Sequence, residues 1–201
     1  MITRNSREPE NFQEILDLYS TAETFIKEVE LCASDIAFPA INELRYAGHH
    51  LLKGLASDDR AKFGAELNDA RDHCHRAMYE ASEAGIAYLV ELLRTFETDY
   101  KDVPVKETVS NYIEIRKSAV SVVKKLSEGR LNRTSPEEQV RKYMEMFRTL
   151  QSGVDTLEAS RCELNKVKRK QAREDQKFII RVVSWAAAAL IGIAGILLQL
   201  G

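Results

Sequence analysis

The chain has 201 residues, with 29 Lys and Arg against 31 Asp and Glu, and a formal net charge of −2. Residues 161–181 hold eight basic and three acidic residues, so residues 1–160 carry a net charge of −7. An acidic body argues against nucleic acid as a partner, because such binding needs a basic surface. The three cysteines are widely spaced and form no C-x-x-C pair, which argues against a zinc or disulfide framework.

Helical periodicity runs through the chain: apolar residues recur three or four positions apart, and no stretch alternates as a strand does. Pro39 breaks the first helix, Asp59 lies in the cap of the third, and Ser135 opens a capping box that Glu138 completes. The expected helices are, in chain order, residues 10–36, 39–56, 60–100, 104–129 and 136 onward. We therefore expect an all-α fold, with a cytosolic antiparallel bundle of four to five helices in residues 1–160.

An apolar stretch lies at the C-terminal end of the sequence. From Val182 to Leu200 there is no charged residue, and at about 1.5 Å per residue such a helix matches the thickness of a bilayer core. Residues 182–200 are therefore predicted to form a single transmembrane helix, into which the last bundle helix continues through a basic stalk, residues 161–181. Because Lys and Arg beside a span stay on the cytoplasmic side, we expect a single-pass, tail-anchored protein with a cytoplasmic N-terminus.

Two sets of site residues depend on this span. Ser184, Ala188 and Gly192 place small side chains on one helix face, which favours association between spans and a homo-oligomer. The basic stalk is expected to lie against anionic head groups of the membrane. The residues assigned to anionic-lipid contact are Lys166, Lys168, Arg169, Lys170, Arg173, Lys177 and Arg181.

The four histidines fall in two short stretches that resemble each other, residues 41–50 and 67–76. In each stretch an Asn, an Arg and a His lie on one flank of the apolar stripe, and a hairpin about residues 57–59 would place the two copies face to face. Guanidinium and amide groups so placed suit an anionic ligand or a protein partner. The predicted ligand-binding residues are Asn42, Arg45, His49, Asn68, Arg71 and His75. The alternative is that they form an ordinary solvated helix flank.

The spacing of the same histidines does not favour a metal site. His49 and His50 diverge around their helix, as do His73 and His75, and no Glu-x-x-His motif accompanies them. We therefore expect no metal and no cofactor. Because no glycine-rich phosphate loop, nucleophile elbow or paired-carboxylate set is present, no catalytic residue is assigned and a non-enzymatic protein is favoured.

Arg45 and His50 match a short Arg…His motif, and over these six residues the chain resembles the HEPN (higher eukaryote and prokaryote nucleotide-binding) ribonucleases, all-helical proteins that cleave RNA across a dimer interface. The resemblance implies that Arg45 would steady the phosphate and His50 would act in proton transfer. Helices followed by an apolar seam and a C-terminal anchor also look like syntaxin-type fusion proteins, which implies a tail-anchored adaptor or tether without a ligand.

The sequence favours a membrane sensor or effector, whose bundle binds an anionic, nucleotide-like ligand or a protein partner and signals through association of the spans. This architecture is analogous to that of bacterial stress and phage-defence effectors, in which a small sensor sits on a membrane segment. The tether and the HEPN-like ribonuclease are the alternatives.

Overall fold

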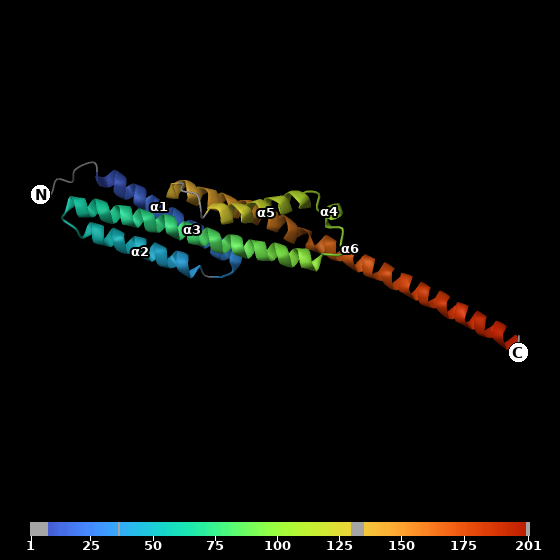
Figure 1. Cartoon of the computed structure of the whole chain (residues 1–201). Helices are drawn as coiled ribbons and strands as arrows, with labels where there is room; N and C mark the ends of the chain where they lie inside the picture. Colours follow the sequence, from blue (N-terminus) through green and yellow to red (C-terminus); the bar gives the residue numbers. More distant parts are fainter. Residues whose placement is uncertain (1–7, 36, 130–134, 200–201) are drawn as a thin grey trace.

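The computed structural model describes residues 8–35, 37–129 and 135–199, and the side chains of residues 12–35, 37–126 and 135–188. Within these ranges the backbone forms six helices and no strand. They are, in chain order, α1 (Glu8–Ala33), α2 (Phe38–Leu55), α3 (Arg60–Asp99), α4 (Val105–Thr108), α5 (Tyr112–Gly129) and α6 (Pro136–Gln199). The prediction of an all-helical bundle is confirmed (Figure 1).

Local side-chain caps mark two of the helix starts. The carboxylate of Asp59 accepts hydrogen bonds from the backbone N–H groups of Ala61 and Lys62, at 2.8 and 3.4 Å, and α3 begins there. The hydroxyl of Ser135 accepts from the N–H of Glu138 at 3.3 Å, before α6. These groups satisfy N–H donors that the first turn of a helix leaves without a partner.

The single helix predicted for residues 104–129 is instead two helices, α4 and α5. The backbone is extended at Val109, with φ −116° and ψ 96°, and this interrupts the helix. Val105 and Val109 are both buried, and α4 packs against α6. The chain therefore bends where burial of these side chains competes with continuation of the helix.

The long helix α3 is the centre of the bundle and packs against α1, α2 and α6 (Figure 1). The short helix α4 and helix α5 pack against α6. The largest fully buried side chains come from α1, α3 and α6, so the main core lies between these three helices. They include Ile15, Phe25, Ile86, Leu89, Phe96, Tyr143, Phe147, Leu150, Leu157 and Leu164.

A glycine in α3 permits the closest of these contacts. A Cβ atom on Gly85 would lie 2.6 and 2.7 Å from ring carbons of Phe147 on α6, and 3.0 Å from Cγ1 of Val29 on α1. The ring of Phe147 packs edge-on against Phe25, with centroids 5.7 Å apart and an interplanar angle of 88°. Only a residue without a side chain allows α1 and α6 to meet over α3 at this level.

The structure contradicts the prediction of a transmembrane helix at residues 182–200, and with it the single-pass membrane topology. In the described part of the chain, no helix combines the length and the apolar character needed to cross a membrane. Charged side chains continue along α6 to Arg181, and the described side chains that follow, from Val182 to Ala188, are all exposed. The surroundings of Gly192, assigned to span association, are outside the described part of the structure, as are the side chains of the other residues after Ala188.

Arg161 joins the C-terminal end of α3 to α6. Its guanidinium lies 2.7 Å from a carboxylate oxygen of Asp99 and 2.6 Å from one of Glu158. It also lies over the rings of Phe96 and Tyr100, at 5.3 and 5.7 Å from their centroids. Arg161, which lies between the buried Leu157 and Leu164 of α6, is thus a contact of the bundle.

Past this junction α6 projects from the bundle as a single helix (Figure 1). Lys168 donates a hydrogen bond to the carbonyl of Asp99 at 2.8 Å, and Lys166 pairs with Glu163 on α6 itself. Every described side chain from Lys168 to Ala188 is exposed, including the other five residues assigned to lipid contact, together with Ser184 and Ala188. The partners of Lys166 and Lys168 are protein groups.

Candidate functional site

A groove runs between α1 and α6, with α3 as its floor. Its volume is about 590 Å³, within the range of roughly 300–1,000 Å³ that is usual for small-molecule sites. Leu18, Met78, Val140 and Met144 supply apolar surface. The remaining lining residues are Thr21, His75, Glu137, Arg141, Glu145, Arg148 and Thr149.

His75 is the buried polar residue of this groove. Its side chain comes from α3 and is 6% exposed, and its Nδ1 atom has no hydrogen-bond partner among the described residues. Burial lowers the pKa of the imidazole, against the opposing effect of Glu137 and Asp72, so the ring is neutral at neutral pH. A buried nitrogen without a partner costs about 1–3 kcal/mol, so a ligand group that hydrogen-bonds to it would recover that cost.

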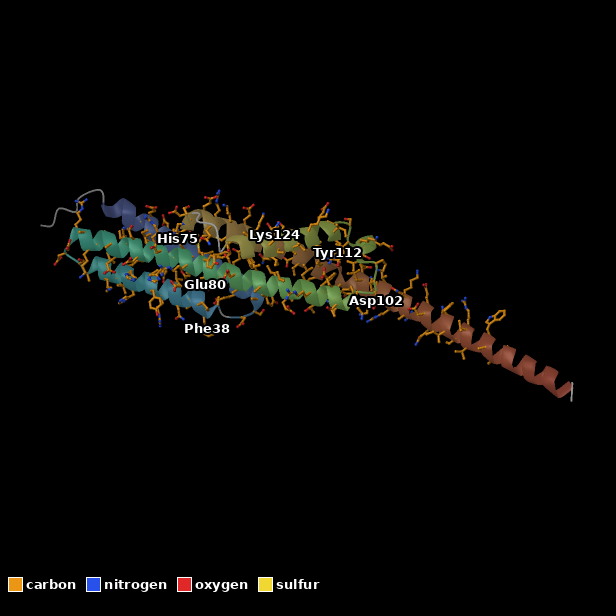
Figure 2. The ribbon with its side chains drawn as sticks, in the orientation of Figure 1. Phe38, His75, Glu80, Asp102, Tyr112 and Lys124 are labelled. Carbon is orange, nitrogen blue, oxygen red and sulfur yellow. The ribbon has the colours of Figure 1, made fainter. Side chains whose placement is uncertain are left out.

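His75 also lines a second hollow, beside the start of α6. This hollow, of about 340 Å³, lies between α3 and the first turns of α6, and it shares His75 and Val140 with the groove. His75 therefore lies between two hollows. Figure 2 places it within the bundle, toward the end away from the projecting part of α6.

An ion pair closes the groove on the other side. Arg148 of α6 donates to both carboxylate oxygens of Glu28 on α1, from Nε at 3.1 Å and from Nη2 at 2.9 Å. Its guanidinium also lies 5.8 Å from the ring centroid of Phe25. This two-bond geometry raises the pKa of Arg148 and fixes the distance between α1 and α6. Arg141, one helical turn before Met144, is a second exposed cation of the rim.

The six residues predicted to bind a ligand have different surroundings in the structure. Arg71 lies 3.3 Å from Glu14 on α1, whereas the guanidinium of Arg45 lies over its neighbour Tyr46 at 5.3 Å from the centroid. The exposed members are Asn42, Arg45, His49 and Asn68. Of the six, His75 lines the groove.

The contacts between the two histidine stretches are made by other residues. His50 Nδ1 lies 2.7 Å from Glu66 Oε2, and His73 Nδ1 lies 2.7 Å from Glu43 Oε2. The hydrogen bond with His50 lowers the pKa of the Glu66 carboxyl, although burial of that carboxyl acts in the opposite direction. Sequence reasoning missed these pairs. The available signal was a glutamate followed by a histidine seven positions later, once in each helix of the hairpin.

These contacts bear on the resemblance to the HEPN ribonucleases. His50, to which the resemblance gives proton transfer, has one ring nitrogen held by Glu66. Arg45, to which it gives phosphate binding, stacks on Tyr46 of its own helix. The two residues thus have separate partners in the described structure.

The fold and the groove define this molecule as an all-helical bundle with a hollow between α1, α3 and α6. A comparison with protein-family models, with curated proteins and with solved structures gives no match to the chain. The groove and the polar contacts between α2 and α3 are the features of the bundle whose chemistry suits a function.

Proposed function

We propose that the bundle is a binding module that takes a small amphipathic anion into the groove between α1 and α6. The observation that carries this proposal is the buried, unpartnered Nδ1 of His75 at the floor of a hollow of about 590 Å³. A neutral imidazole can donate one hydrogen bond to a carboxylate or phosphate oxygen. Such a partner would remove the cost of leaving this nitrogen unbonded.

The lining sets the chemical class of the ligand. Leu18, Met78, Val140 and Met144 would cover an apolar body, and the flexible methionine side chains can adapt to its shape. The exposed guanidinium of Arg141 would meet an acidic head group near His75. A ligand with an acid at one end and an aliphatic or aromatic body therefore fits the groove better than a fully polar anion.

The groove favours binding over catalysis. The two hydroxyl groups that line it are tied to their own helices: Thr21 donates to the carbonyl of Asp17 and Thr149 to that of Glu145, both at 2.8 Å. The nearby thiol of Cys74 is buried, which raises its pKa to about 12 and keeps it protonated. The described lining residues thus offer no activated nucleophile.

Binding here would act on the relation between α1 and α6. Each helix contributes residues to the groove, and the ion pair of Arg148 with Glu28 already joins them at one side. A ligand between them would add contacts to both helices and stabilise the bundle by mass action. Because α6 continues to Gln199, a change in its seating on α3 would be carried along the projecting helix.

The test uses the full chain and anilinonaphthalene sulfonate, an aromatic anion whose fluorescence rises in apolar sites. We expect one saturable component that decanoate displaces and that decanol, which lacks the acid, displaces at least about fivefold less well, as a charge-assisted hydrogen bond predicts. Met144→Trp should remove this component by filling the groove. Arg141→Ala should weaken it, and Arg94→Ala, an exposed arginine of α3 outside the groove, should leave it unchanged.

Two results would contradict the proposal. The first is a saturable component that persists in Met144→Trp, because the probe would then occupy another surface, such as the exposed apolar residues of α6. The second is equal displacement by decanoate and decanol, which would leave an apolar hollow without any role for His75 or Arg141.

A further inference from the structure

The two helices of the α2–α3 hairpin carry the same pattern of polar residues. On α2 the pattern is Glu43, Tyr46, His50 and Lys53. On α3 it is Glu66, Asp69, His73 and Arg76. Positions separated by three, four and three residues lie on one face of a helix. Each helix therefore presents a glutamate, a middle residue, a histidine and a basic residue on a single stripe.

Antiparallel packing places the two stripes against each other in opposite directions. The glutamate of each helix holds Nδ1 of the histidine of the other, at 2.7 Å in both cases: Glu66 with His50, and Glu43 with His73. The two imidazole rings stack at the centre, with centroids 5.1 Å apart and an interplanar angle of 22°. The four residues are thus related by a local two-fold axis, and carboxylates and stacking together fix the orientation of both rings.

The two halves of this arrangement differ at the middle position. Asp69 places a carboxylate oxygen 3.6 Å from Nδ1 of His50, whereas the equivalent Tyr46 places its ring 5.5 Å from that of His73. One half therefore has a ring nitrogen and two carboxylates, whose ligand atoms all lie within 4.8 Å of one another. The other half has a ring nitrogen, one carboxylate and a phenol ring.

We propose that His50, Glu66 and Asp69 form a binding site for a divalent first-row transition-metal ion. Two ligands bound to one such ion, at about 2.0–2.2 Å from the metal, lie about 2.8–3.6 Å apart in tetrahedral or octahedral geometry. The observed separations from Nδ1, 2.7 and 3.6 Å, are close to this range. The carboxylate oxygens of Glu66 and Asp69 lie within 4.8 Å of each other, and rotation of the exposed Asp69 side chain would bring them closer. An imidazole with two carboxylates suits Zn²⁺ or Mn²⁺ better than Ca²⁺ or Mg²⁺, which prefer oxygen ligands throughout.

The surroundings of the site are consistent with ion entry from solvent. The side chains of His50 and Glu66 are 20% and 11% exposed, whereas that of Asp69 is 59% exposed, so the open coordination positions face outward. Coordination through Nδ1 requires the single proton of a neutral imidazole to move to Nε2 by exchange with water. The ammonium of Lys53, 3.6 Å from Glu66, is a cation that the metal ion would displace from this carboxylate.

This proposal is independent of the groove, since its ligands lie on α2 and on the α2-facing side of α3. It also differs from the sequence expectation, which considered each helix alone. Histidines that diverge on one helix meet carboxylates of the neighbouring helix once the hairpin forms. A bound ion would connect α2 to α3 and raise the thermal stability of the chain.

The test is calorimetric titration of the full chain, freed of metal by chelation, with Zn²⁺ and separately with Mn²⁺, which binds thiolates poorly. We expect one equivalent of ion and a higher melting temperature. Asp69→Asn, at an exposed position that should keep the fold, should weaken binding about tenfold or more. Lys53→Met should strengthen binding. Tyr46→Asp should create a second equivalent by giving the other half its missing carboxylate.

His49→Ala and Cys162→Ser are the matched controls, because both side chains are exposed and neither belongs to the site. Both variants should bind as the wild type does. Equal affinities of wild type and Asp69→Asn would overturn the proposal, as would loss of the bound ion in either control. Circular dichroism spectra of the variants confirm that each comparison is made between folded proteins.

Discussion

Two glycines of α3 offer a direct test of the packing, because the same substitution should act in opposite directions. An alanine methyl at Gly85 would lie 2.6 and 2.7 Å from the ring of Phe147, where carbon atoms in contact normally lie about 3.5–4.0 Å apart. The ring cannot easily withdraw, because Phe147 is 0% exposed and rests edge-on against Phe25. At Gly64 the same methyl meets nothing within 4 Å.

The magnitudes follow from two opposing effects. Replacing glycine by alanine inside a helix gains about 1 kcal/mol of intrinsic helix stability at either position. Overpacking at Gly85 costs about 1–3 kcal/mol, and a contact this short between rigid groups places the cost at the upper end. Gly85→Ala should therefore lower the free energy of unfolding by about 1–2 kcal/mol, and Gly64→Ala should raise it by up to about 1 kcal/mol.

The assay is urea unfolding followed by far-ultraviolet circular dichroism for the wild type and both variants. The double variant Gly85→Ala, Phe147→Leu should recover part of the loss, with a coupling energy of about 1 kcal/mol or more. If Gly85→Ala instead stabilises the protein as Gly64→Ala does, the ring of Phe147 on α6 does not lie in contact with Gly85.

Two further predictions concern ionised groups. Because burial keeps His75 neutral while the unfolded chain takes up a proton near pH 6.5, stability should fall as pH drops below that value, and His75→Phe should reduce this slope by up to about 1.4 kcal/mol per pH unit, measured by urea unfolding between pH 5 and 7. Arg161→Met removes the pairs with Asp99 and Glu158 at a site 27% exposed, and should cost about 1–2 kcal/mol, whereas Arg94→Met, at 69% exposed, should change the urea midpoint little.

Features that depend on neighbouring residues in the chain were predictable from the sequence. At the caps of Asp59 and Ser135, the side-chain oxygen accepts a hydrogen bond from a backbone N–H two or three residues later, so a local pattern suffices to find them. The break at Val109 could not be found in this way. It depends on burial of that side chain in the bundle, which a helical period along residues 104–129 does not report.

The candidate site shows the same division. His75 was singled out by its place in a repeated pattern, but its importance comes from α6, which covers it from a distant part of the sequence. The pairs of His50 with Glu66 and of His73 with Glu43 needed only the hairpin register, which places residues equidistant from the turn beside each other. A metal motif within one helix cannot reveal them, because the paired residues lie on two helices.

The projecting part of α6 has a consequence for how unfolding of this protein can be observed. Denaturant m-values and heat-capacity changes scale with the surface that unfolding exposes, and beyond Lys168 the described side chains are exposed already. The m-value and the heat-capacity change should therefore have the values expected for unfolding of residues 8–167. Both should be smaller than the values expected for a folded chain of the full length. The single tryptophan, Trp185, is 79% exposed on this helix, so its emission should stay nearly constant while the bundle melts.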